Sequence, residues 1–193
     1  MIRKTDLRVK LTKRLLKNAI IDLLEFKDVQ EISVTELCEN AGINRTTFYC
    51  HYKSIEEIII EIENDVLIDY ERVYNILTPD YDLDDLISNL LKFFVEHARV
   101  LGLVLNKKKD FGLMQQIYRY SFDRFKKYVT DNLSQEKTEP IMYLFYGLSY
   151  GIIGIIGKWY KNEMQDPINV VESAITRVMF GILSTIIDFK DII

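Results

Sequence analysis

The chain has 193 residues, of which 48% are hydrophobic and 28% charged, with a net charge of −4 and a pI near 5.3. This length and apolar content allow a packed core. The overall acidity excludes a protein that binds polyanions over its whole surface. Apolar residues recur every three to four positions without an alternating strand pattern, which predicts an all-α fold of about nine helices.

The N-terminal 17 residues are locally basic despite the acidic total. They contain seven basic side chains and one acidic side chain, Asp6, which gives a net charge of +6. A local excess of this kind is typical of phosphate contacts. No apolar run follows it as in a secretory signal, so we expect a cytoplasmic protein. The basic residues are Arg3, Lys4, Arg8, Lys10, Lys13, Arg14 and Lys17.

Residues 33–54 contain two short helical patterns joined by a turn. Ser33 and Glu36 form a Ser-x-x-Glu capping box that predicts a helix start. Gly42 fits the left-handed position that ends this helix, and Asn44 is a suitable N-cap for a second helix over 45–52. Two helices in this arrangement predict a helix-turn-helix that reads DNA.

The second helix of this pair carries an unusual number of polar side chains. Phe48 and Tyr52 share one face, which predicts that they are buried. Most of the other side chains are polar, as base edges and phosphate oxygens require. An ordinary corner between two helices, with a solvated second helix, is the alternative.

The segment from Leu11 to Glu57 resembles the DNA-binding domain of the TetR family of bacterial regulators. The resemblance rests on AGIN at Ala41–Asn44 and RTTFYCHYKSIEE at Arg45–Glu57. It implies a DNA-binding domain over 1–53 and a helical regulatory and dimerisation domain over 54–193. Thr46 replaces a frequent glycine of the family, and Ile55 replaces a lysine that contacts phosphate. The expected DNA-binding residues are Thr35, Asn44, Arg45, Thr46, Thr47, Tyr49, His51 and Lys53.

The two cysteines lie twelve residues apart, without the spacing of a zinc site. Cys38 is expected in the core of the first helix of the pair. Cys50, on the second helix, is either a redox sensor or an unremarkable small side chain.

A helix is expected from Ser54 to about Leu77, because Pro79 ends the helical pattern. This helix would connect the DNA-binding domain to the rest of the helical regulatory domain, which is called the body below. The following acidic run at Asp80, Asp82 and Asp84 resembles a calcium loop. It lacks the glycine and the glutamate that such a loop needs. We interpret the run as a turn and an acidic helix start, and expect neither metal nor cofactor.

Further helices are predicted over about 83–96, 99–105 and 111–133. Aromatic and methionine side chains at helical spacing usually form core. The family resemblance implies that some of them line a pocket for an unknown small-molecule inducer. The candidates are Phe93, Phe94, His97, Phe111, Met114, Tyr118, Phe122, Tyr146, Tyr150 and Trp159.

The stretch 141–157 has no charged residue, but it is short for a membrane span and has no charge asymmetry around it. Its glycines share one broad helical face, which predicts close helix packing. With a last helix over 167–188 it would form a four-helix dimer interface. The expected interface residues are Gly147, Gly151, Gly154, Val171, Ile175, Val178, Met179 and Ile182.

These features and the family resemblance predict a homodimeric, ligand-responsive regulator that binds a palindromic DNA operator. A repressor is preferred over an activator only because the resemblance implies it, since most members of the family repress. The alternative is a helical enzyme or small-molecule-binding protein with an incidental helix-turn-helix corner. No Ser/His/Asp set, phosphate loop or metal-ligand cluster supports an enzyme, because His51 and His97 are the only histidines. The inducer, the operator sequence and the regulated genes cannot be deduced from the sequence.

Overall fold

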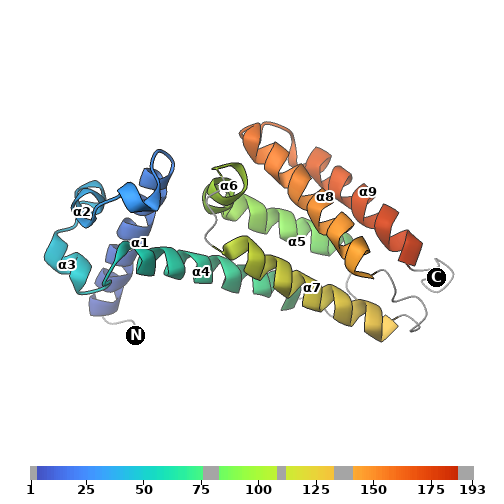
Figure 1. Cartoon of the computed structure of the whole chain (residues 1–193), viewed down its shortest axis with the longest axis horizontal. Coiled ribbons are helices and arrows are strands. Elements are labelled where there is room, and N and C mark those ends of the chain that lie inside the picture. Colours follow the sequence, from blue (N-terminus) through green and yellow to red (C-terminus); the bar gives the residue numbers. More distant parts are fainter. Residues whose placement is uncertain (1–3, 76–82, 108–111, 133–140, 187–193) are drawn as a thin grey trace. The chain divides into compact units, whose positions relative to one another are not determined.

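The computed structural model describes residues 4–75, 83–107, 112–132 and 141–186, where it contains nine α-helices and one short 3-10 helix (Figure 1). The described part has no strand, which confirms the predicted all-α fold. The acidic run at 80–82 and the pocket candidate Phe111 lie outside the described residues. The elements are α1 (Lys4–Leu24), η1 (Val29–Glu31), α2 (Val34–Ala41), α3 (Arg45–Tyr49), α4 (Ile55–Asn75), α5 (Leu83–Glu96), α6 (Ala98–Lys107), α7 (Leu113–Asn132), α8 (Ile141–Lys161) and α9 (Ile168–Ile186).

Most predicted helix positions agree with the structure. The α3 helix ends at Tyr49 rather than at about Tyr52. The uncharged stretch 141–157 lies within α8, which ends at Lys161. The 3-10 turn η1 has no periodic signal in the sequence and was not predicted.

The chain forms two compact units, Met1–Val66 and Leu67–Ile193, and the division falls inside α4. In the first unit α1 packs against α2, and α2 against α3. Its centre consists of side chains with no exposed surface. These are Leu16, Ile20, Leu37, Phe48 and Ile58.

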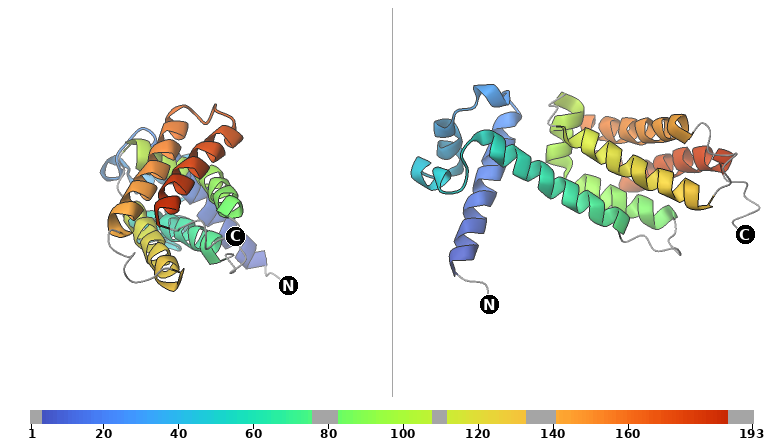
Figure 2. Two further views of the ribbon diagram at one scale, coloured as in Figure 1. Left: turned by 90° about the vertical axis from the view of Figure 1, so that its right-hand side faces the viewer. Right: turned by 60° about the horizontal axis from the view of Figure 1, so that its bottom comes forward.

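In the second unit α8 packs against α9, α6 and α7, and α9 also packs against α5. The views in Figures 1 and 2 both show α8 and α9 side by side. The unit has an apolar centre to which each of these helices contributes. Its most deeply buried side chains include Ile87, Leu91, Leu101, Leu113, Ile156 and Ile175.

Two glycines of α8 lie where α9 approaches it. A Cβ atom at Gly151 would lie 3.1 Å from Val178 Cγ1, and one at Gly147 would lie 3.7 Å from Ile182 Cδ1. A Cβ atom at Gly154 or at Gly157 would meet nothing within 4 Å. The first two glycines therefore permit helix contact within one chain, and the other two leave open space on the surface of α8.

The α9 residues expected at a dimer interface are largely occupied within the single chain. Val171, Ile175 and Met179 are buried, with at most 5% of each side chain exposed. Val178 and Ile182 are half-buried against the glycines of α8. Among the described helices, none is long and apolar enough to cross a membrane.

Candidate nucleic-acid interface

The first helix of the helix-turn-helix begins at a side-chain cap. Ser33 Oγ accepts a hydrogen bond from the Glu36 N–H at 3.1 Å, as the sequence predicts. The Glu36 carboxylate instead accepts from Lys27 Nζ at 2.5 Å. The predicted capping box is therefore half formed, and the glutamate ties α2 to the segment before η1.

The turn between α2 and α3 depends on Gly42. Its φ of 65° places it in the left-handed region, where the N–H groups of Gly42 and Ile43 reach the last carbonyls of α2. A residue with a Cβ atom is strained in this conformation. Asn44 then caps α3, because its Oδ1 accepts the Thr47 N–H at 2.7 Å.

The α3 helix has five residues and is anchored by aromatic side chains. Phe48 is fully buried, and its ring centroid lies 6.1 Å from that of Tyr52, which is 4% exposed. The N–H groups of His51 and Tyr52 both donate to the Phe48 carbonyl at 2.9 Å. This shared acceptor tightens the chain into a turn, so the regular helix ends at Tyr49.

Most of the predicted DNA-binding side chains are available at the surface of this unit. Tyr49 is 52% exposed. Thr47 and His51 are half-buried, and the oxygen of Asn44 is used for the cap. Ile55 is buried at 6% exposure, so it offers no phosphate contact at the start of α4, whereas Lys53, two residues before it, is exposed. The exposed members are Thr35, Asn44, Arg45, Thr46, Tyr49 and Lys53.

An ion-pair cluster between α1 and α4 was not predicted from the sequence. Lys13 and Lys17 donate to Glu61 at 2.7 and 2.8 Å, and Lys17 also donates to Asp65 at 2.6 Å. The lysines and the acids are each four residues apart, so each pair occupies one face of its helix. That matched spacing was the available signal, but sequence alone does not show which helices face each other.

This cluster shifts the titration of its members. Burial opposes the charge of Glu61, but hydrogen bonds from Lys13 and Lys17 outweigh it and lower the pKa of Glu61 to about 2. Burial likewise opposes the charge of Lys17, while Asp65 and Glu61 raise its pKa. Burial first, and the Glu61 charge second, raise the pKa of Tyr52.

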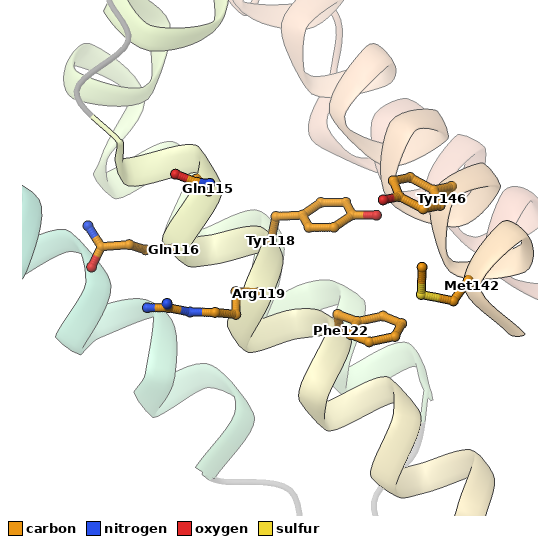
Figure 3. Close-up of a pocket in the computed structure, with 7 residues that line it drawn as sticks. All are labelled: Gln115, Gln116, Tyr118, Arg119, Phe122, Met142 and Tyr146. Carbon is orange, nitrogen blue, oxygen red and sulfur yellow. The ribbon is translucent and has the colours of Figure 1, made fainter.

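The body contains a hollow of about 400 Å³ along α7 and α8 (Figure 3). Three of the predicted pocket residues line it: Tyr118, Phe122 and Tyr146. Figure 3 shows Tyr118 and Tyr146 pointing toward each other and Phe122 toward Met142, and the rings of the two tyrosines are 5.4 Å apart. Burial and the neighbouring Tyr146 hydroxyl raise the pKa of Tyr118 to about 12. The other lining residues are Gln115, Gln116, Arg119 and Met142.

The remaining pocket candidates lie elsewhere in the body. Phe93, Phe94 and Trp159 are core residues with at most 4% exposure, and Tyr150 is 68% exposed. His97 Nε2 lies 3.3 Å from Asp69 Oδ2. Met114 is half-buried.

Comparisons with known proteins agree with this architecture. A family model described as a transcriptional regulator C-terminal region of the TetR type matches residues 81–181. No curated protein matches the sequence. The solved structure of the dihydroxyacetone kinase operon activator DhaS is similar, with a TM-score of 0.51 and 18% identity over 91% of this chain and 96% of that chain. The flavonoid-responsive regulator FrrA gives a TM-score of 0.53 and 12% identity over 90% and 96%.

A helix-turn-helix is a DNA-reading motif, and here a second, helical unit follows it along the chain. Because the family model covers more than half of the chain, the chain belongs to the TetR family of transcriptional regulators. The two solved structures share its fold.

Proposed function

We propose that this regulator binds a palindromic operator as a homodimer and represses transcription until a small molecule binds its body. The observation that carries the proposal is the α3 surface, where Arg45, Thr46 and Tyr49 are exposed over a buried Phe48. These polar and aromatic side chains are exposed on one face of the short helix, while Phe48 packs its opposite face into the core. Direct readout in a major groove needs this combination.

DNA binding is tested by fluorescence anisotropy with duplexes from the chain's own upstream region, at several salt concentrations. We expect binding that weakens steeply as salt rises, because basic side chains replace counterions at phosphates. Absent binding, or binding insensitive to salt, would contradict the proposal.

The dimer is supported by exposed apolar side chains on the outer faces of α8 and α9. Tyr143 and Tyr150 are 79% and 68% exposed, and Phe180 is 44% exposed. Large exposed apolar patches on a helix pair mark association surfaces. Gly154 lies on the same stretch of α8 as these tyrosines, and the space beside it is open.

Sedimentation velocity on the full chain tests this assembly. The double substitution Tyr143→Glu and Tyr150→Glu places two charges on the proposed interface, so we expect a monomer. Ile60→Glu, at a residue that is 54% exposed on α4, is the control and should leave the dimer intact. A dimer that survives the double substitution would place the interface elsewhere.

Control by a ligand is supported by the hollow along α7 and α8, whose aromatic, amide and guanidinium groups suit a small organic molecule. The words "flavonoid-responsive" describe the similar protein. At 12% identity the similarity shows only that the two chains share a fold. The same holds for the word "activator" in the other name. Transcript levels after deletion of the gene test the sign, since a repressor's targets rise and an activator's fall.

An enzyme with an incidental helix-turn-helix corner is the weaker alternative. The family to which the chain belongs is defined by transcriptional regulators.

A further inference from the structure

The basic side chains of α1 that the structure describes, from Arg8 onward, divide into two groups. Arg8, Lys10 and Arg14 are exposed and form no ion pair within the described residues. Lys13 and Lys17 are instead held by carboxylates of α4, and their side chains are 33% and 17% exposed. The charge of α1 that is available to DNA is therefore smaller than the sequence suggests.

The geometry makes Glu61 the centre of the held group. Its two oxygens accept separate lysines, Oε2 from Lys13 at 2.7 Å and Oε1 from Lys17 at 2.8 Å. Asp65 is a second acceptor for Lys17 at 2.6 Å. All four residues lie within the same compact unit as the helix-turn-helix.

The held group also reaches the chain segment that supports α3. Lys13 Nζ lies 5.1 Å from the centroid of the Tyr52 ring, and that ring packs against Phe48. A cation over an aromatic ring is attracted to it. Lys13 is thus fixed by a carboxylate and a ring together, which leaves its ammonium group little freedom to turn toward a phosphate.

We propose that Glu61 is a positioning residue that limits non-specific DNA binding by keeping Lys13 and Lys17 neutralised, so that specific contacts from α3 decide where the regulator binds. The proposal rests on the DNA-binding function proposed above. A lysine that neutralises a phosphate releases counterions and tightens binding. A lysine that is already neutralised by a carboxylate releases few, and moving it would leave that carboxylate uncompensated beside the polyanion.

The test compares the unaltered chain with Glu61→Gln, which keeps the shape of the side chain and removes its charge. Binding to a mixed-sequence duplex is followed by anisotropy over a series of salt concentrations. We expect the slope of log K against log salt to steepen by about 1 to 2, as one or two lysines become available. At low salt the variant should bind this duplex roughly three- to tenfold more tightly.

Two controls separate pairing from a simple change in net charge. Glu71→Gln makes the same charge change on the same helix, at a half-buried glutamate without an ion pair among the described residues. It should leave the slope unchanged. In a chain that carries Lys13→Gln and Lys17→Gln, adding Glu61→Gln should no longer steepen the slope, and melting by circular dichroism checks that each variant is folded.

The outcomes distinguish this inference from the proposed function. Salt-dependent binding by the unaltered chain, with equal slopes for Glu61→Gln and Glu71→Gln, would overturn the role of Glu61 and leave the function standing. Steepening that persists without the two lysines would also overturn it. If the unaltered chain binds no duplex at all, both proposals fail together.

Discussion

In the unit Met1–Val66, α2 and α3 begin at hydrogen bonds between residues three apart, in which the side chains of Ser33 and Asn44 accept from backbone N–H groups. In the unit Leu67–Ile193, the helices are tied by contacts between distant residues. The Tyr160 hydroxyl donates to the Phe94 carbonyl at 2.6 Å, and the hydroxyls of Tyr70 and Ser121 lie 2.5 Å apart. Contacts between neighbouring residues can be recognised in the sequence, which is why the short motif was predictable. Contacts between distant residues, such as those of the body, become known only from the folded structure.

The largest expected effect concerns the core of the first unit. Phe48→Ala removes a fully buried ring and should lower the free energy of unfolding by about 3–5 kcal/mol. Urea unfolding followed by circular dichroism measures the change. Tyr49→Ala is the matched control, because the neighbouring ring is half exposed and its loss should change stability by less than about 1 kcal/mol.

A second prediction separates DNA contact from stability on the same helix. Arg45→Ala should weaken binding to a specific duplex by about 1–3 kcal/mol if the guanidinium reads a base. The exposed position of Arg45 predicts an unchanged melting temperature. Competition between specific and mixed-sequence duplexes provides the measurement, and equal losses on both would mean that Arg45 contacts phosphate only.

Alanine substitutions at two glycines should change stability in opposite directions in the turn and in the body. Gly42→Ala should destabilise the protein by about 1–2 kcal/mol, because φ is 65° and only conformational strain is added. Gly157→Ala lies inside α8 with open space beside it and should stabilise the protein by about 1 kcal/mol. Thermal unfolding of both variants checks the opposite signs, and two losses of similar size would contradict this account of Gly157.

The smallest effect concerns pH. The pKa of Glu61 is about 2 in the folded protein, below its ordinary value of 4.5, so its ion pairs stabilise the protein fully above pH 4.5. This contribution should fade as pH falls from about 4.5 toward 2, by roughly 1 kcal/mol after allowance for solvent screening. The free energy of unfolding, measured at several pH values across this range, should depend less on pH for Glu61→Gln than for the unaltered chain. The same pH dependence in both would contradict the ion pairing of Glu61.

Much of the first unit, Met1–Val66, could be predicted because its signals are local. Ser33, Gly42 and Asn44 each act within a few residues, and the burial of Phe48 follows from helical spacing. The end of α3 at Tyr49 could not be predicted, because it depends on two N–H groups that share the Phe48 carbonyl. The Glu61 cluster joins residues 48 positions apart, and no local pattern specifies that pairing.

The body was predictable in its helices but not in its surfaces. Among its aromatic residues, the sequence cannot separate Phe93, which is buried, from Tyr146, which lines the hollow. Similarly, Val171 and Phe180 lie on the same helix, yet one is in the core and the other is 44% exposed. Which face is covered depends on the neighbours of each helix, and these are set by the whole fold.

We propose above that the α3 surface reads DNA as one of two copies in a dimer. Selection of bound sequences from a random duplex library by the full chain is the decisive experiment. We predict an enriched palindrome whose half-sites are about one helical turn apart, roughly 34–36 Å, and loss of that enrichment with Arg45→Ala and Tyr49→Ala combined. No enrichment by the unaltered chain, or the same palindrome from the double variant, would show that α3 does not read DNA in this way.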